Sequence, residues 1–308
     1  MGDVVHALPL AADLAANVPD VQIDWVVEES FAAIPAMSRH VGHVQTVALR
    51  RWRKTPLSTA AWQEIGAARH ALREARYDCV LDAQGLLKSA WVARWAGAPV
   101  AGLSSASARE RLAALFYARR IDVPRELHAV ERCRRLGAAV FDYAADGSPR
   151  FDMAVSAQPV AVASPTAVLL VNASRASKLW DEAKWVALER GLTAQGMTSV
   201  LFWGAPDEQQ RVQRLAAAMQ RAIAAPRSPL DGIAATLARA QVVIGLDTGL
   251  THLAAALGRP TVGIYCDYDP QLVGLVGDGP VRSLGGVGQS PTVEDVSSAA
   301  AQVMGGAQ

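Results

Sequence analysis

The run Asp247-Thr248-Gly249, with His252 three positions further on, combines a hydroxyl, a glycine and an imidazole, which suit a phosphate group, with a carboxylate. Residues 242–246 before it are apolar, so we predict that a buried strand ends there and that a helix begins at Thr248. The amide groups at the start of that helix would bind an anion such as a diphosphate, and Gly249 would let the backbone approach it. Asp247 would face the crevice at the carboxyl end of the strand. The alternative is an ordinary helix cap beside a core histidine.

Two more polar loops follow predicted strands in the same half of the chain. Ser174 and Lys178 come after the strand predicted at 167–172, where Lys178 would neutralise a departing diphosphate and Ser174 would add a hydroxyl. Glu208 comes after the strand predicted at 198–203 and would accept hydrogen bonds from ribose hydroxyls. Each has a simpler alternative, because loop lysines are commonly solvated and an acid at a helix start complements the helix dipole.

Basic residues are concentrated just after a predicted strand in the first half: Arg50, Arg51, Arg53 and Lys54. A solvated face or a nucleic-acid patch would also fit, but without a wider basic stripe we favour a compact anion such as a phosphate or carboxylate as the ligand. Gln84 and Lys88 follow another strand and would face the same crevice. Asp82, just before them, is either part of that surface or a structural cap.

Asp3 lies at the opening of the first helical pattern, beside Gly2. It is either an N-cap, a role that aspartate often fills, or a general base. Its position in the sequence does not distinguish the two.

Short apolar runs alternate with amphipathic stretches along the whole chain, which is typical of βαβ units and parallel sheets. We predict strands at 21–27, 44–49, 79–83, 99–103, 167–172, 198–203, 241–246 and 260–265. We predict helices at 60–76, 86–96, 106–119, 126–140, 181–195, 206–219, 229–240 and 248–257. Helix-start signals at Ser228 and Thr292 mark two further boundaries.

The predicted organisation is α/β, with two doubly wound domains, 1–155 and 156–308, and a linker near residues 150–165. A doubly wound domain normally begins with a strand, whereas this chain enters a helical pattern at once. We therefore expect the first strand of the first sheet to be missing.

Composition excludes several classes of protein. The chain has 308 residues, 51% of them hydrophobic, and a formal net charge of +1, which argues against disorder and against a dedicated nucleic-acid binder. The longest stretch without charged residues is interrupted by prolines and polar residues, so no membrane span is predicted. Three cysteines without paired spacing and the absence of a visible signal peptide lead us to expect a cytoplasmic location. We expect no cofactor, and no acidic cluster has metal-ligand spacing.

Two other functions use the same kind of sheet. A nicotinamide dehydrogenase would need a strand followed by GxGxxG and a helix, and the only comparable run, Gly285-Gly286-Val287-Gly288, lies in a loop context. A non-catalytic nucleotide-binding protein would keep the anion site but have no need of a base such as Asp3.

Several motifs together resemble glycosyltransferase family 9, the lipopolysaccharide heptosyltransferases: GDVVHALP, DWVVEE, RRWRK, DAQGLLKSA, HAVER, LFWGAPDE and GLDTGLTHLAAALGRPTVGIY. The resemblance covers nearly the whole chain, and RRWRK and DAQGLLKS resemble type I members more than type II. It implies a GT-B fold, in which two Rossmann-like domains face a central cleft. The first domain would bind the acceptor and the second the nucleotide sugar.

The resemblance also implies the reaction: inverting transfer of L-glycero-D-manno-heptose from ADP-heptose to the Kdo sugar of Kdo-lipid A. Asp3 then matches the catalytic base, and Lys178 supports the departing diphosphate. The donor-binding positions are Ser174, Lys178, Glu208, Asp247, Thr248, Gly249 and His252, although Ala173-Ser174 replaces the two consecutive hydroxyl residues usual in the family. The acceptor-binding positions are Arg50, Arg51, Arg53, Lys54, Gln84, Lys88, Arg109 and Arg120.

The lipid acceptor implies contact with a membrane. We expect a monomer, peripheral on the cytoplasmic face of the inner membrane, that meets anionic headgroups through Arg50–Lys54, Arg109, Arg119 and Arg120. A type II enzyme is the nearest competitor within the family, distinguished by an acceptor that already bears one heptose.

Overall fold

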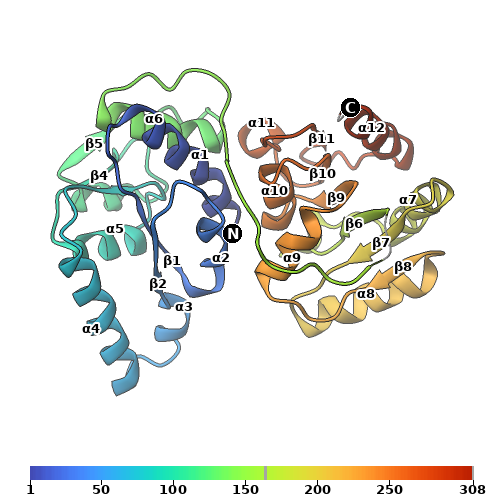
Figure 1. Ribbon diagram of the computed structural model, residues 1–308, viewed down its shortest axis with the longest axis horizontal. Coiled ribbons are helices and arrows are strands. Elements are labelled where there is room, and N and C mark those ends of the chain that lie inside the picture. Colours follow the sequence, from blue (N-terminus) through green and yellow to red (C-terminus); the bar gives the residue numbers. More distant parts are fainter. Residues whose placement is uncertain (163–164, 307–308) are drawn as a thin grey trace. The chain divides into compact units, whose positions relative to one another are not determined.

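The computed structural model describes residues 1–162 and 165–306, and the chain divides into two compact units (Figure 1). The N-terminal unit is His6–Ser148, and the C-terminal unit is Pro149–Gln308 together with Met1–Val5. Of the predicted linker, residues 150–162 form no helix and no strand longer than a single bridge, and residues 163 and 164 lie outside the described residues. The domain boundaries 1–155 and 156–308 stay a prediction.

The C-terminal unit is built on six parallel strands in the order β11-β10-β9-β6-β7-β8. They are β6 (Thr166–Leu170), β7 (Thr198–Leu201), β8 (Ala222–Ala224), β9 (Val242–Leu246), β10 (Thr261–Tyr265) and β11 (Val281–Gly285). Numbered along the chain, this is the 3-2-1-4-5-6 order of doubly wound nucleotide-binding domains. Every residue of β7, β9 and β10 is buried, which explains the continuous apolar runs that predicted these strands.

Helices cover this sheet (Figure 1). They are η4 (Ala176–Lys178), α7 (Glu182–Ala194), α8 (Pro206–Ala218), α9 (Leu230–Leu237), α10 (Gly249–Ala256), α11 (Pro270–Val273) and α12 (Val293–Gly305). The predicted N-cap of α12 is confirmed, because Thr292 Oγ1 accepts from the Asp295 amide at 3.1 Å while the Asp295 carboxylate accepts from the Thr292 amide at 3.0 Å. The predicted cap at Ser228 is wrong. Its hydroxyl donates to the Pro226 carbonyl at 2.9 Å, and Pro229 is the N-cap.

In the N-terminal unit the described strands form two separate parallel sheets, β1-β2 and β3-β4-β5. The strands are β1 (Asp24–Glu28), β2 (His43–Val47), β3 (Val80–Asp82), β4 (Val100–Leu103) and β5 (Arg119–Ile121). The helices are α1 (Gly2–Asn17), η1 (Glu29–Phe31), α2 (Ala33–Ala36), α3 (Leu49–Trp52), α4 (Thr59–Glu74), α5 (Leu87–Ala93), η2 (Arg94–Ala96), η3 (Arg111–Phe116) and α6 (Ala129–Phe141).

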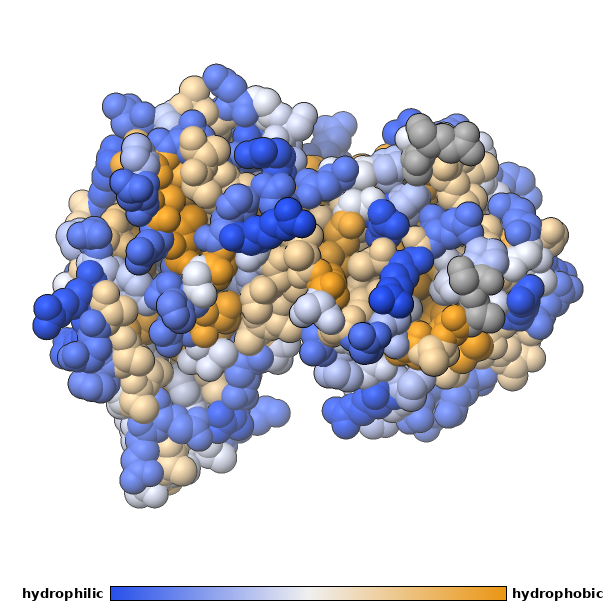
Figure 2. Space-filling view, viewed as in Figure 1, coloured by the Kyte–Doolittle hydropathy of each residue, from blue (hydrophilic) through white to orange (hydrophobic). Residues whose placement is uncertain are grey.

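The two sheets correspond to strands 3-2 and 4-5-6 of the doubly wound order, and no described strand fills position 1 between them. One edge of β1 is therefore unpaired among the described strands, and Val26 on β1 is exposed. Figure 2 shows hydrophobic residues at the surface of this unit over the region where Figure 1 draws β1. Position 1 between the two sheets is the position at which the sequence leads us to expect a missing strand.

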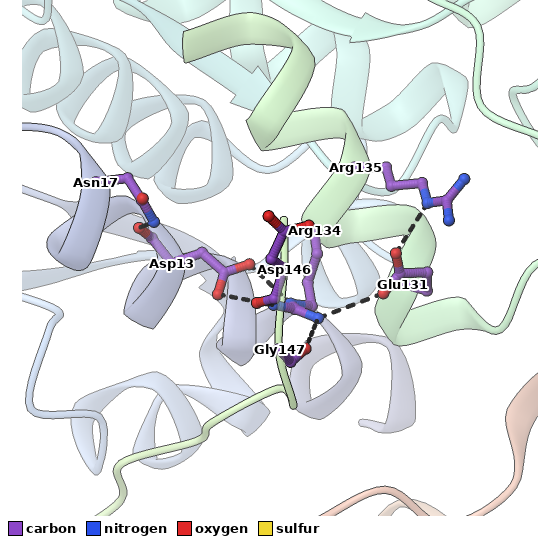
Figure 3. A network of polar contacts seen from close by, with 7 residues as sticks. All are labelled: Asp13, Asn17, Glu131, Arg134, Arg135, Asp146 and Gly147. Atoms are coloured by element: carbon purple, nitrogen blue, oxygen red, sulfur yellow. Dashed lines mark hydrogen bonds and ion pairs between the residues drawn. The ribbon is translucent and has the colours of Figure 1, made fainter. Parts of the chain in front are cut away.

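A buried arginine joins three segments of the N-terminal unit (Figure 3). Arg134 on α6 donates to the carboxylate of Asp13 on α1 at 2.8 and 3.3 Å. It also donates to the carbonyls of Gly147, at 3.1 Å, and Asp146, at 3.2 Å, and it contacts Glu131 at 3.4 Å. A buried guanidinium needs such partners because an unpaired charge is costly to remove from water. The network thereby fixes the position of α1 against α6.

The helix predicted at 106–119 is wrong. The structure has the short η3 helix there, followed by the start of β5. The reason is Tyr117, whose side chain is buried and donates to Asp82 Oδ2 at 2.7 Å. A Cβ placed on Gly102 would lie 2.5 Å from the Tyr117 ring, so this glycine leaves the space that the ring needs. Anchoring Tyr117 in this way ends the helical turn early.

Candidate functional site

The turn after β9 presents the start of α10 as an anion site. Thr248 is the N-cap residue, but within the described residues its side chain does not cap the helix; its hydroxyl lies 3.2 Å from that of Thr251. Thr251 in turn donates to the Leu246 carbonyl at 2.6 Å, which fixes the helix start to the end of the strand. The first amides of a helix have no partner within the helix itself, so this end can bind a negative group.

Lys178 reaches this turn from η4, and its ammonium group contacts the Asp247 carboxylate. The other carboxylate oxygen of Asp247 lies 3.4 Å from Nε2 of His252, which α10 supplies. All three side chains are largely buried. Burial acts to raise the pKa of Asp247, but hydrogen bonds from His252 and Lys178 and their charges outweigh it, so the pKa lies below its ordinary value. Asp247 is therefore ionised at neutral pH.

A second loop, after β10, adjoins the same lysine. The Tyr268 ring lies 5.9 Å from Nζ of Lys178, and Asp267 accepts a hydrogen bond of 2.7 Å from Ser177. Arg175 is 3.8 Å from the same Asp267 carboxylate. Sequence reasoning missed Asp267 and Tyr268. Their position at the carboxyl end of the strand next to β9 is the signal that would have found them.

The structure brings Lys178, Asp247, Thr248, Gly249 and His252 together, but it uses Glu208 differently. Oε2 of Glu208 accepts from the amides of Gly204 at 2.7 Å and Ala205 at 3.1 Å, so this carboxylate caps α8. A contact from Glu208 to ribose stays a prediction. Ser174 is exposed in the loop before η4.

The basic run of the N-terminal unit is partly neutralised by acidic residues. Arg51 donates to Glu29 and Glu64 at 3.0 to 3.1 Å, and hydrogen bonds from Arg51 and Trp52 lower the pKa of Glu64. The guanidinium of Arg50 lies 5.1 Å from the centre of the Phe31 ring. The remaining cations predicted to bind the acceptor are exposed: Arg53, Lys54, Lys88, Arg109 and Arg120.

Asp82 proves to be a structural cap. Its Oδ1 accepts from the amides of Gln84 at 2.9 Å and Gly85 at 3.3 Å, and its Oδ2 accepts from Ser89 at 2.8 Å and from Tyr117. Burial, together with the Asp82 charge and hydrogen bond, raises the pKa of Tyr117, which therefore stays a donor. The buried carboxylate thus shapes the loop that carries Gln84.

Asp3 is the second residue of α1 rather than its cap. It belongs to Met1–Val5, the segment grouped with the C-terminal unit. A Cβ placed on Gly249 would lie 2.5 Å from the side chain of Met1, so the start of the chain adjoins the turn after β9. Among the described residues, no group of three or more His, Cys, Asp or Glu side chains is placed to hold a metal ion.

Comparison with known proteins identifies the family. The family model for glycosyltransferase family 9 (heptosyltransferase) matches residues 65–301. The chain belongs to glycosyltransferase family 9. Lipopolysaccharide heptosyltransferase 1 of Pseudomonas aeruginosa is 43% identical over 92% of this chain and 80% of its own length. The protein of the same name in Escherichia coli K12 is 42% identical over 90% of this chain and 88% of its own length.

A solved structure of this family, the E. coli heptosyltransferase WaaC with ADP, matches with a TM-score of 0.86 at 37% identity, over 97% of this chain and 95% of the other. The same enzyme with ADP-2-deoxy-2-fluoro heptose matches with a TM-score of 0.82 at 37% identity, over 98% of this chain and 95% of the other. The predicted GT-B type of fold, with two Rossmann-like units, is confirmed. As a member of family 9, this chain is a glycosyltransferase.

Proposed function

We propose that this glycosyltransferase moves L-glycero-D-manno-heptose from its ADP conjugate to the Kdo sugar of Kdo-lipid A, with inversion at the anomeric carbon. The observation that carries the proposal is the pairing of Lys178 with Asp247 at the start of α10, a site suited to a diphosphate. Relatives named lipopolysaccharide heptosyltransferase 1, at 42 and 43% identity, support heptose as the transferred sugar.

On the donor side, the bond between the anomeric carbon and the diphosphate oxygen breaks and its electron pair leaves with ADP. The negative charge that develops there is stabilised by the ammonium of Lys178 and by the amides at Thr248 and Gly249. Asp247 holds Lys178 in place, and His252 holds Asp247. Ser174 and Glu208 complete the proposed donor site. Such preorganised charges matter because the sugar passes through a transition state with oxocarbenium character.

On the acceptor side, the Asp3 carboxylate takes the proton of the attacking Kdo hydroxyl. Inversion requires attack from the face opposite the departing ADP, so one base and one charge-stabilising site suffice. The acceptor carries carboxylate and phosphate groups, and the exposed cations of the N-terminal unit provide matching charge: Arg53, Lys54, Lys88, Arg109 and Arg120. Gln84, Arg50 and Arg51 complete this proposed surface.

The protein acts as a monomer that visits the cytoplasmic face of the inner membrane, where its lipid-borne acceptor lies. Within the described residues, no helix is both long enough and apolar enough to cross a bilayer. Attraction between the cations of the N-terminal unit and anionic headgroups supports a peripheral, reversible contact.

Turnover with ADP-heptose and a deacylated Kdo acceptor tests the function. We expect release of ADP and an acceptor whose mass grows by one heptose. No product from this acceptor, together with product from one that already bears a heptose, would instead indicate a type II enzyme. ADP binding without any product would indicate a non-catalytic nucleotide-binding protein.

Replacing the proposed base tests the mechanism. The variant Asp3→Asn keeps the size of the side chain but cannot accept the proton, so turnover should fall by about 10²–10⁴-fold while the affinity for ADP stays within about twofold. Asp20→Asn is a matched control, because Asp20 is exposed and has a positive φ that asparagine tolerates. An Asp3→Asn variant that turns over as fast as the parent protein would rule out Asp3 as the base.

A further inference from the structure

The N-terminal unit exposes four large apolar side chains on two neighbouring elements. Leu87 and Trp91 on α5 are 38% and 46% exposed, and Leu112 and Leu115 on η3 are 60% and 69% exposed. Large apolar residues scattered singly over a surface are ordinary, whereas a group of them indicates an interaction site. We call these four residues the apolar face.

The two elements hold these side chains on one surface. Residues four apart on an α-helix share a face, as Leu87 and Trp91 do. Residues three apart on a 3₁₀-helix eclipse each other, as Leu112 and Leu115 do. The inner sides of both helices carry small residues that pack together in one buried cluster, which includes Ala90, Ala113 and Ala114.

Two hydrogen bonds of Glu110, one through its side chain and one through its backbone, bring the starts of α5 and η3 side by side. The Glu110 carboxylate accepts from the Leu87 amide at 2.5 Å, and the Glu110 amide donates to the Gly85 carbonyl at 3.0 Å. Since Glu110 directly precedes η3, Leu87 and Leu112 lie at adjoining ends of the two elements. The apolar face therefore spans the adjoining starts of both elements.

Exposed cations flank the apolar face. Lys88 follows Leu87, Arg94 lies three residues after Trp91, and Arg111 precedes Leu112. Apolar side chains that include tryptophan, flanked by lysine and arginine, are the composition by which a protein surface lies in a membrane interface. The indole suits this position because its body is apolar and its N–H remains hydrated.

We propose that the apolar face of α5 and η3 inserts into the surface of an anionic lipid bilayer, with Lys88, Arg94 and Arg111 at the level of the headgroups. This inference rests on the proposed function, because a lipid-borne acceptor must be reached at a membrane. The proposed acceptor surface consists largely of exposed cations, which can attract headgroups but do not enter the lipid. The apolar face adds the side chains that enter it. With the Glu110 carboxylate at the junction included, the charge around the apolar face is still net positive, which favours an anionic membrane over a protein partner.

Vesicle flotation tests the proposal with the full chain. Vesicles of phosphatidylcholine and phosphatidylglycerol in equal parts should bind the protein, and vesicles of phosphatidylcholine alone should bind it about tenfold less. The double variant Leu112→Ser with Leu115→Ser should lose at least about tenfold in affinity for the mixed vesicles. The variant Arg94→Gln with Arg111→Gln should approach the weaker binding seen with phosphatidylcholine alone.

Val287→Ser is the matched control, because Val287 is also an exposed apolar residue, 68% exposed, but lies in the C-terminal unit. This variant should bind vesicles like the parent protein. All three variants should turn over the soluble, deacylated acceptor as fast as the parent protein. This measurement separates the membrane contact of the apolar face from the proposed enzymatic function. Loss of vesicle binding with that turnover intact supports the apolar face. No turnover by the parent protein defeats the proposed function instead.

Three outcomes would overturn the apolar face as a membrane contact. The leucine variant binds mixed vesicles like the parent protein, the parent protein binds both kinds of vesicle equally, or the parent protein sediments as a dimer that the leucine variant dissociates. The third outcome would assign the face to a second copy of the chain. If the leucine variant fails to fold, the arginine variant takes its place in the first comparison. Binding of the arginine variant to mixed vesicles like the parent protein would then overturn the proposal.

Discussion

Lys178 and Asp247 are separated by 69 residues in the sequence and meet because β6 and β9 are neighbours in the sheet. The carboxyl ends of parallel neighbours lie at the same edge, so a loop after one strand reaches the turn after the other. His252 then fixes the second oxygen of Asp247. The result is a largely buried ammonium held by one carboxylate, close to a helix start that attracts anions.

The charge of Lys178 is the first property to test. Lys178→Gln removes the cation that we propose balances the departing diphosphate, so kcat/KM for ADP-heptose should fall by about 10²–10³-fold. Lys184→Gln is the matched control, since Lys184 lies in the same unit but donates to Ser290 and the Pro291 carbonyl. Equal losses for the two variants in steady-state kinetics would show that Lys178 has no special role.

The ionisation of Asp247 predicts a pH dependence of stability. Its pKa is lowered in the folded protein, so the carboxylate stabilises the fold above its unfolded pKa near 4, and this contribution is lost as the pH falls through the lower folded value. Asp247→Asn should therefore reduce the free energy of unfolding by about 1–3 kcal/mol at neutral pH and by less below about pH 4. Urea unfolding of both proteins from about pH 7 to about pH 3 measures this. A difference that grows in acid would contradict the assignment.

At the scale of elements, the sequence predicted the buried strands of the C-terminal unit because burial on both faces leaves an uninterrupted apolar run. It missed β8 and β11, since β8 has only three residues and β11 includes Arg282 and Ser283. It also missed the end of the helical turn before Tyr117, because a long-range bond to Asp82 decides it. The residues next to Tyr117 in the sequence carry no information about a hydrogen-bond partner that lies 35 residues away.

The candidate site shows the same limit. Thr248 and Gly249 could be predicted because a strand, a turn and a helix start follow one another in the sequence. For Asp267 and Tyr268 the sequence offers only their place just after a predicted strand, since their contacts with Ser177 and Lys178 depend on a loop about ninety residues earlier. The capping bonds of Glu208 and Asp82 likewise required the fold, because each residue type fits a ligand site and a helix start equally well.

The link between α1 and α6 gives a prediction about stability. Arg134→Met leaves the Asp13 carboxylate and two carbonyls without their donor, so the free energy of unfolding of the N-terminal unit should drop by about 3 kcal/mol. Arg135→Met is the control, because Arg135 bonds Glu131 at 2.8 Å at an exposed site and should cost less than about 1 kcal/mol. Urea unfolding that finds the two variants equally stable would refute the structural role of Arg134.

At the scale of the whole molecule, a formal net charge of +1 provides little long-range attraction, so local clusters must do the electrostatic work. The exposed cations are concentrated in the N-terminal unit, whereas Lys178 in the C-terminal unit is largely buried beside Asp247. Salt screens exposed charges much more than buried ones. Acceptor and donor should therefore respond differently to ionic strength.

Raising the salt concentration from about 0.05 to about 0.5 M should increase KM for a Kdo acceptor several-fold while changing KM for ADP-heptose by less than about twofold. Steady-state kinetics with each substrate varied in turn measures both values. Equal salt sensitivity of the two KM values would contradict the proposal that exposed cations bind the acceptor and the buried Lys178 binds the donor.

A crystal structure of this chain with bound ADP tests the central claim most directly. We predict that the diphosphate lies against the amides of Thr248 and Gly249, with the ammonium of Lys178 within hydrogen-bond distance of a phosphate oxygen. A diphosphate bound away from the start of α10, with Lys178 still paired only to Asp247, would contradict it.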